Sequence, residues 1–262
     1  MVDYHAHTNL CGHATGSVSE YIESALSKGI REIGFSDHAP LPESIRGGYT
    51  MPADEVDTYI KTVEEQRDRC AHRIAVRVGF EVDYPLRGSF ASGYLTDSRI
   101  DYLIGSCHFI DGWPFDHPEF IDGYRVREID DIHARYFSIL GSLAESGLFN
   151  VVGHFDIVKK FGFRASRDFL PAIEGIARSM AANGVAAEVN TAGLLHPAGE
   201  MYPSDSILRV FFNCNVPVTL GSDAHSADQI GYQFPLALEK ITGAGYRKIS
   251  GFLKRKRYDI AV

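Results

Sequence analysis

Cysteine is scarce in this chain, and the few cysteines show no pairing. They stand at positions 11, 70, 107 and 214, without a C-x-x-C or any other close spacing. Neither a disulfide framework nor a zinc finger is therefore predicted. Long apolar runs are also missing, because no stretch approaches the roughly 18 consecutive apolar residues of a membrane-spanning helix.

An excess of positive charge is absent as well. The formal net charge is −8, which argues against a chain that wraps nucleic acid. The same negative net charge suits a protein that binds cations, since three divalent ions would offset about six negative charges. The first residues are charged and polar, so no signal peptide is predicted, and we expect a cytoplasmic protein without a membrane partner.

Short apolar runs alternate with longer amphipathic stretches. Strands are predicted at 2–7, 31–36, 75–82, 101–107, 150–153, 185–190 and 216–221, with a weaker one at 246–250. Helices are predicted near 18–28, 54–70, 125–146, 167–182, 204–213 and 229–241, the first with Ser17 as N-cap and Gly29 as C-cap. This alternation predicts an α/β fold with a parallel sheet, and seven or eight such units close most naturally into a barrel. No repeat or linker divides the 262 residues, so we expect a single domain spanning 1–262.

What the sequence does have is a crowd of histidines near its start. The stretch "VDYHAHTNLCGHA" holds His5, His7 and His13. Side chains alternate along a strand, so His5 and His7 point to the same face, as two ligands of one metal ion would.

Residues with metal-binding chemistry follow nearly every predicted strand. Barrel enzymes build their sites at these carboxyl ends. In chain order the residues are His5, His7 and His13; Asp37 and His38; Glu81 and Asp83; His108; His154 and Asp156; Glu188 and Asn190; Asp223 and His225. A single histidine is more often structural, but seven placed in this way, with Glu81 and Asp223, favour a metal site.

The size of the set predicts more than one ion. Zinc, iron and manganese accept imidazole nitrogen and carboxylate oxygen, and a carboxylate can bridge two ions. Seven histidines and two carboxylates are too many for one ion and suit three divalent ions. Two ions roughly 3.5–4 Å apart activate a hydroxide and neutralise a phosphoryl group in transfer.

The order of these motifs resembles the PHP (polymerase and histidinol phosphatase) family. The motifs are HxH, SDH, GFE, CHF, GHFD and SDAH, and they span most of the chain. The segments "SCHFIDGWPFD" and "EVNTAGLLHPAGEMYPS" are similar to the histidinol-phosphate phosphatase branch.

The resemblance implies a distorted (β/α)7 TIM-like barrel with three metal ions. It implies a first ion held by His5, His7, Glu81 and Asp223. Glu81 would bridge to a second ion held with His108 and His154, and a third would be held by His13, His38 and His225.

The implied reaction is hydrolysis of the small molecule L-histidinol phosphate to L-histidinol and phosphate, a step of histidine biosynthesis, by a metal-activated hydroxide. Glu81 and Asp223 are the expected catalytic carboxylates, and the proton for the leaving group could come from water, Asp223 or His196. Two alternatives stay open: another phosphate ester or nucleotide as substrate, and a non-catalytic metal-stabilised binding module. Association of copies into a homo-oligomer is also left open.

The family usually has a basic residue after "NTAGL", where this chain has Leu195 followed by His196. A lost cation weakens a charge-assisted contact to phosphate. A protonated His196 could replace it, and Lys159, Lys160 or Arg164 could supply the other phosphate clamp. His117 is expected at the surface, with a place on a substrate-binding lid as the alternative.

For the other polar and aromatic residues near the predicted ligands we expect supporting or structural roles. We expect Asp156 to orient an imidazole, whereas Asp37 and Asp83 either orient one or cap a helix. Asp3 is expected to be a solvated strand start, Cys11 and Cys107 small buried residues, His72 and His133 surface residues, and "KRKR" at 254–257 a solvated end. Trp113, Phe115 and Tyr202 either line an imidazole-binding wall or pack in the core.

Overall fold

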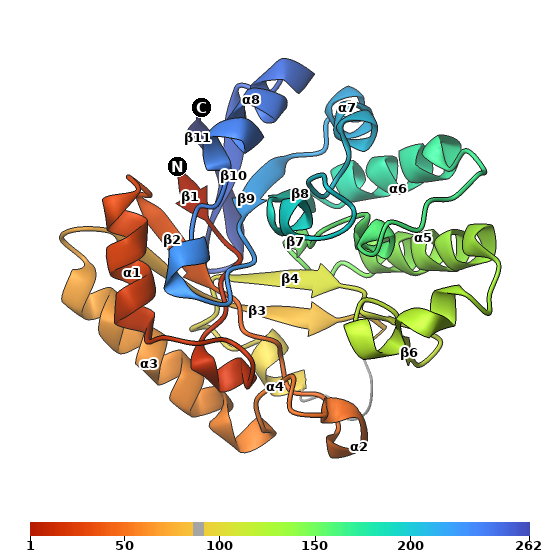
Figure 1. Cartoon of the computed structure of the whole chain (residues 1–262). Coiled ribbons are helices and arrows are strands. Elements are labelled where there is room, and N and C mark those ends of the chain that lie inside the picture. Colours follow the sequence, from red (N-terminus) through yellow and green to blue (C-terminus); the bar gives the residue numbers. More distant parts are fainter. Residues whose placement is uncertain (86–91) are drawn as a thin grey trace.

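The computed structural model describes residues 1–85 and 92–262. Seven parallel strands form one sheet in the order β1-β2-β3-β4-β7-β8-β9, with helices on its outer side (Figure 1). The strands are β1 (Val2–Asp3), β2 (Glu32–Phe35), β3 (Ala75–Asp83), β4 (Tyr102–Ser106), β7 (Val151–Val152), β8 (Ala186–Asn190) and β9 (Val218–Gly221). All seven lie where the alternation predicts them. β7 is short because His154, just beyond it, has a φ of 20°, which an extended strand does not allow.

The sheet closes into a barrel between its first and last strands. The backbone N–H of Tyr4 donates to the Leu220 carbonyl at 2.9 Å, and that of His7 donates to the Ala224 carbonyl at 2.9 Å. The fold class is therefore the predicted TIM-like α/β barrel with seven strands.

Asp3 lies at this closure, and the prediction of a solvated strand start is wrong. Its carboxylate is fully buried and accepts hydrogen bonds from the backbone N–H groups of Ser222 and Gly231, both at 3.0 Å. The Ser222 hydroxyl donates to it as well, at 2.5 Å. Asp3 thus fastens β1 to the segment that follows β9.

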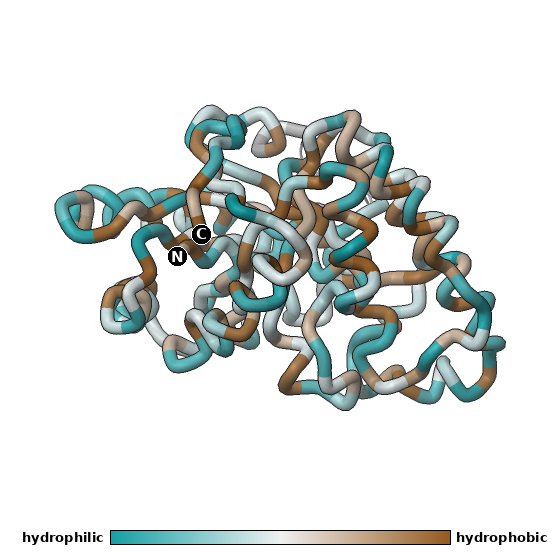
Figure 2. The backbone as a smooth tube through the Cα atoms, turned by 90° about the horizontal axis from the view of Figure 1, so that it is seen from above, coloured by the Kyte–Doolittle hydropathy of each residue, from teal (hydrophilic) through white to brown (hydrophobic). Residues whose placement is uncertain are grey.

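Helices cover the outside of the barrel. They are α1 (Val18–Ser27), α2 (Glu43–Arg46), α3 (Val56–Cys70), α4 (Ser92–Leu95), α5 (Ile129–Glu145), α6 (Leu170–Ala182), α7 (Asp205–Asn213) and α8 (Phe234–Ala244), with 3₁₀ turns at Asn9–Cys11, Ala53–Glu55, Pro118–Tyr124, Ile157–Lys159, Ala192–Leu195 and Ala227–Gln229. Apolar and polar stretches alternate along the outer helices (Figure 2), as expected when one face packs on the barrel.

Helix α1 shows how the sequence sets an element's ends. Ser17 is its N-cap and forms a capping box with Glu20, in which each side chain accepts from the other's backbone N–H. At the other end Lys28 is the cap residue, and Gly29 follows it with a φ of 70°.

The weak eighth strand does not enter the barrel. It is β10 (Lys248–Leu253), which pairs antiparallel with β11 (Lys256–Ala261). The turn between them is Lys254–Arg255, with φ values of 49° and 65°. The Arg255 guanidinium donates to the Leu148 carbonyl at 2.5 Å and to the Leu95 carbonyl at 3.1 Å. The solvated end predicted for "KRKR" is therefore wrong at Arg255, which ties the hairpin to the barrel.

His72 is exposed as predicted, but the surface position predicted for His133 is wrong. His133 lies in α5, is 7% exposed, and stacks on Phe169 with ring centroids 6.0 Å apart. Its Nε2 contacts the Phe163 carbonyl oxygen at 3.3 Å. Burial lowers the pKa of His133 below its usual value of 6.5.

This burial predicts a pH-dependent stability. The unfolded chain binds the proton more readily, so the contribution of a neutral His133 is present above about pH 6.5 and is lost as the pH falls, by at most about 1.4 kcal/mol per pH unit. We expect His133→Gln to reduce the loss of unfolding free energy between pH 7 and pH 5, measured by urea titration. His72→Gln is the control; equal slopes for both variants would contradict the prediction.

Within the described ranges, no helix combines the length and apolar character needed to cross a membrane.

Candidate metal centre

The nine predicted ligands converge at the carboxyl ends of the barrel strands. They are His5 and His7 after β1, His13 in the following loop, His38 after β2, Glu81 in β3, His108 after β4, His154 after β7, and Asp223 and His225 after β9. Two of them, His154 and Asp223, have positive φ values of 20° and 54°. Such conformations cost about 1–3 kcal/mol each and are typical of functional sites.

Four of these side chains form a first cluster. His5 Nε2 lies 3.3 Å from Glu81 Oε2 and 3.5 Å from Asp223 Oδ1. His7 Nε2 lies 3.6 Å and 3.3 Å from the same two oxygens. An ion with ligands at about 2.0–2.1 Å in a tetrahedron has ligand–ligand edges of about 3.3–3.4 Å. The donor set and its spacing therefore fit a metal ion.

The other oxygen of Glu81 belongs to a second cluster. Glu81 Oε1 lies 2.8 Å from His154 Nε2 and 3.4 Å from His108 Nε2, and the two imidazole nitrogens are 3.2 Å apart. Each oxygen of this carboxylate thus serves a different group of histidines. That is the arrangement of a bridging ligand.

A third group lies on the other side of His7. His13 Nε2 and His225 Nε2 are 2.9 Å apart. His38 lies between the groups: it shares one candidate set with His7 and His225, and its Nδ1 is 3.0 Å from Glu81 Oε2. Cys11 Sγ is within 4.8 Å of the ligand atoms of His13 and His225. Burial raises the pKa of the Cys11 thiol to about 12, so the thiol is protonated when no ion is bound.

Buried nitrogen atoms in this centre lack hydrogen bonds. Among the described residues, His5 Nε2, both ring nitrogens of His7 and His154 Nδ1 are buried without a hydrogen-bond partner. An unsatisfied buried polar group costs about 1–3 kcal/mol. Coordination of a metal ion would satisfy two of them, His5 Nε2 and His7 Nε2, which are the nitrogens that face the first cluster, and this supports the fit.

The electrostatics keep the carboxylates charged and His7 neutral, whereas nearby carboxylates raise the pKa of His5 and of His108 well above the usual histidine value. Burial alone would raise the pKa of Glu81, but His5, His38 and His108 hold it well below its usual value. Burial, together with His225 and His38, lowers the pKa of His7 well below the ordinary histidine value. Ionised carboxylate and neutral imidazole are the forms that bind metals, so a bound ion would displace the protons of His5 and His108.

Two further carboxylates orient the imidazoles. Glu188 Oε1 lies 2.7 Å from His5 Nδ1, and its Oε2 accepts from the backbone N–H of His154 at 2.7 Å. Asp83 Oδ1 lies 2.9 Å from His108 Nδ1, so this residue, left open by the sequence, orients an imidazole. The sequence placed Glu188 at a strand end but gave it no role; its available signal was an acidic residue inside an apolar strand.

Asp37 and Asp156 act differently from the expectation. Asp37 accepts from both the N–H and the hydroxyl of Thr8, at 2.5 Å each, and so holds the loop after His7. Asp156 Oδ2 accepts from Lys159 Nζ at 2.6 Å and from the Ser204 N–H at 3.1 Å. The contact with an imidazole that we expected for Asp156 is not formed, because Lys159 takes its place.

The predicted phosphate-binding cations separate into two places. Buried Lys159 and half-exposed Arg164 line a cavity of about 230 Å³ that also includes His133 and none of the nine clustered residues. Both cations contact Glu200, Lys159 at 3.4 Å and Arg164 at shorter range. The clamp that we expected from Lys159 and Arg164 is thus turned toward this other cavity.

Lys160 and His196 lie within electrostatic range of the clusters: His196 senses Lys160, Asp223 and His225. Lys160 Nζ is 3.5 Å from Asp116 Oδ2. Burial and the Lys160 charge lower the pKa of His196, so this side chain is uncharged at neutral pH when no ligand is bound. Leu195, at the usual basic position, is 51% exposed.

The aromatic candidates mostly pack. Phe115 and Tyr202 are fully buried, and Trp113 packs edge-on against Tyr124 at 4.9 Å. His117 is half-buried and contacts the Tyr49 ring at 4.8 Å, and Tyr49 in turn lies 6.1 Å from His13. His117 therefore reaches the rim of the centre through Tyr49.

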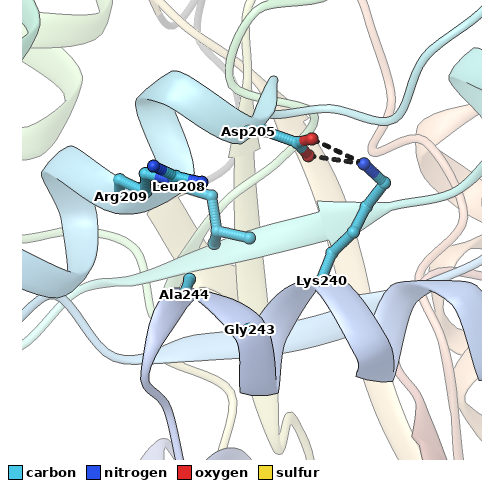
Figure 3. Close-up of a pocket in the computed structure, with 6 residues that line it drawn as sticks. All are labelled: Asp205, Leu208, Arg209, Lys240, Gly243 and Ala244. Atoms are coloured by element: carbon cyan, nitrogen blue, oxygen red, sulfur yellow. Dashed lines mark hydrogen bonds and ion pairs between the residues drawn. The ribbon is translucent and has the colours of Figure 1, made fainter.

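A smaller hollow of about 150 Å³ lies between α7 and α8 (Figure 3). Lys240 Nζ contacts both carboxylate oxygens of Asp205 across it, at 2.6 and 2.7 Å. Its lining contains no predicted ligand.

Comparison with known proteins decides the family. The family model described as "PHP domain" matches residues 3–192. The chain belongs to the PHP domain family. A probable histidinol-phosphatase of Deinococcus radiodurans is 35% identical to this PHP protein over 257 residues, covering 98% of each chain. The histidinol-phosphatase of Bacillus subtilis is 28% identical, covering 91% of this chain and 98% of the relative.

A solved structure has the same fold. It is the histidinol phosphate phosphatase of Lactococcus lactis in complex with zinc, L-histidinol and phosphate. The TM-score is 0.83 at 20% identity, with 98% of each chain covered. This similarity establishes that the PHP barrel follows a known fold over almost its whole length.

Proposed function

We propose that this PHP protein is a metal-dependent histidinol-phosphatase, which hydrolyses L-histidinol phosphate to L-histidinol and phosphate in the cytoplasm. The single observation that carries the proposal is the position of Glu81, whose two oxygens face two separate histidine clusters. Full-length similarity to the Deinococcus radiodurans and Bacillus subtilis proteins supports the choice of substrate.

The residues divide the work of the site. His5, His7, Glu81 and Asp223 would hold one ion, and Glu81 with His108 and His154 a second; His13, His38 and His225 are the proposed ligands of a third. Divalent ions in such a site neutralise the charge of a phosphoryl group and acidify water. Zinc, iron and manganese all suit the donors.

The other residues orient ligands and substrate. Glu188 and Asp83 fix the ring orientations of His5 and His108, which keeps their ligand nitrogens aimed into the clusters. Lys160 is the proposed phosphate-binding cation, since its charge acts on His196, which follows the uncharged Leu195 and also senses Asp223 and His225. Neutral His196 is a candidate to donate a hydrogen bond to the ester.

Phosphate release from L-histidinol phosphate, beside nucleoside monophosphates and p-nitrophenyl phosphate, tests the proposal. We expect kcat/KM for L-histidinol phosphate to exceed that for the other esters by at least about 100-fold, which corresponds to about 3 kcal/mol of transition-state discrimination. Weak and equal turnover of all esters would favour a different phosphate ester as substrate. No turnover with bound metal would favour a non-catalytic module.

A further inference from the structure

We propose that Asp116 and Lys160 form a recognition pair for substrates that carry both a phosphate and a nearby ammonium group. Lys160 binds the phosphate, and Asp116 binds the ammonium group on the carbon next to the ester methylene. The inference rests on the proposed function and adds the basis of its selectivity. Asp116 was given no role by the sequence and is not one of the ligands of the three clusters.

A short hairpin brings Asp116 back beside a metal ligand. Strands β5 (Phe109–Ile110) and β6 (Trp113–Pro114) pair antiparallel, with Phe109 opposite Pro114. Continuing this register by one residue places Phe115 opposite His108, and Asp116 follows directly. The two turn residues have φ values of 50° and 92°, which a tight two-residue hairpin turn requires.

The neighbours of Asp116 fix the direction of its side chain. Phe115 is fully buried, with its ring 5.5 Å from that of Tyr136. His117 has extended backbone angles of −89° and 131° and contacts Tyr49 at the rim. Neighbouring side chains point to opposite sides of an extended segment, so Asp116 is turned away from the core that Phe115 enters. It is turned to the side where Lys160 lies.

The contact between Asp116 and Lys160 is loose. The 3.5 Å between Lys160 Nζ and Asp116 Oδ2 exceeds the roughly 2.7–2.9 Å of a strong charge-assisted hydrogen bond. The side chains are 16% and 18% exposed, so both are reachable from solvent. An aspartate with a usual pKa of about 3.9 that lies next to a lysine carries its charge at neutral pH. Two opposite charges are thus held side by side without being fully satisfied by each other.

L-Histidinol phosphate carries the complementary charges. Its phosphate and its ammonium group are separated by two carbon atoms, so the phosphate can bind Lys160 while the ammonium group binds Asp116. The ion pair between Lys160 and Asp116 is then replaced by two ion pairs with the substrate, so neither side chain is left with an unpaired charge. An ester without an ammonium group would draw Lys160 toward phosphate and leave Asp116 repelling the same phosphate, which selects against that ester.

Replacement of Asp116 tests the pair. We expect Asp116→Asn to raise KM for L-histidinol phosphate on the order of 10- to 100-fold, the value of one charged hydrogen bond, while kcat changes little. For p-nitrophenyl phosphate, which lacks the ammonium group, kcat/KM should rise, because the repulsion is gone. Asp116→Glu should keep the preference for the ammonium-bearing ester. Asp122→Asn, an exposed change in the same loop, is the matched control.

Calorimetry provides a readout that does not depend on turnover. Titration of the metal-loaded protein with L-histidinol should show weaker binding to Asp116→Asn, whereas inorganic phosphate should bind more tightly than to the wild type. Equal losses for both ligands, or for both esters, with an active wild type would overturn the pair and leave the proposed function standing. Absence of wild-type turnover of L-histidinol phosphate would overturn the proposed function, and the pair with it.

Discussion

Glu81→Gln is expected to lower kcat/KM for L-histidinol phosphate by at least about 1,000-fold, equivalent to about 4 kcal/mol of transition-state stabilisation. The amide keeps the size of the side chain but removes the negative charge and one of the two oxygens. Because Glu81 Oε2 belongs to the first cluster and Oε1 to the second, the substitution leaves one cluster without the oxygen ligand of this side chain and gives the other a weaker, neutral amide oxygen. Metal content per chain, measured by plasma emission spectrometry, should fall together with activity.

Glu23→Gln is a suitable control for this substitution. Glu23 is exposed on α1 and pairs with the exposed Arg73, and neither residue is one of the nine proposed ligands. Near-ultraviolet circular dichroism of Glu81→Gln should resemble that of the wild type, because the volume is conserved. A Glu81→Gln protein that binds its metal fully and retains activity would show that the carboxylate is not a bridge.

Removal of the metal is expected to abolish activity and to lower the melting temperature by about 10 °C. Nine side chains supply ligand atoms in a small volume, and several of their buried nitrogens lack hydrogen bonds. One ion present at 1,000 times its dissociation constant contributes about 4 kcal/mol. Each kcal/mol shifts the melting temperature of a domain of this size by about 2–4 °C.

The measurement is differential scanning calorimetry before and after dialysis against a chelator, with phosphate release assayed in parallel. Zinc, manganese or iron(II) should restore both properties. Magnesium should not, because it prefers oxygen ligands and keeps its waters. An unchanged melting temperature together with unchanged activity after verified metal removal would contradict a metal centre.

The sequence predicted the parts of this fold that depend on local pattern. Each strand end was visible as an apolar run that stops at a histidine or a carboxylate, because the period of two and the polarity change are local. His5 and His7 could be assigned to one face for that reason. The grouping of ligands into clusters needed the family resemblance, since contacts between strand ends depend on barrel closure.

Residues that act across the barrel escaped prediction. Asp3 is a charged residue near the start of a strand, where sequence alone predicts exposure to solvent. It is buried because β1 and the segment after β9 meet there. His133 lies on a helix whose buried face includes the loop at Phe163, which periodicity does not show. Asp116 lies near His108 because of the register in which β5 and β6 pair. That register depends on the length of the turn between the two strands, which the sequence pattern does not reveal.

Glu188 couples the positions of the ligands in the first and second clusters. One oxygen holds the ring of His5, and the other holds the backbone at His154, so a single carboxylate spans ligands of both clusters. A shift of β8 by a fraction of an ångström would misalign both sets of ligand nitrogens together. Laboratory evolution that reshapes the barrel mouth should therefore accept changes in the loops after β2 and β6 far more readily than any change that moves β8.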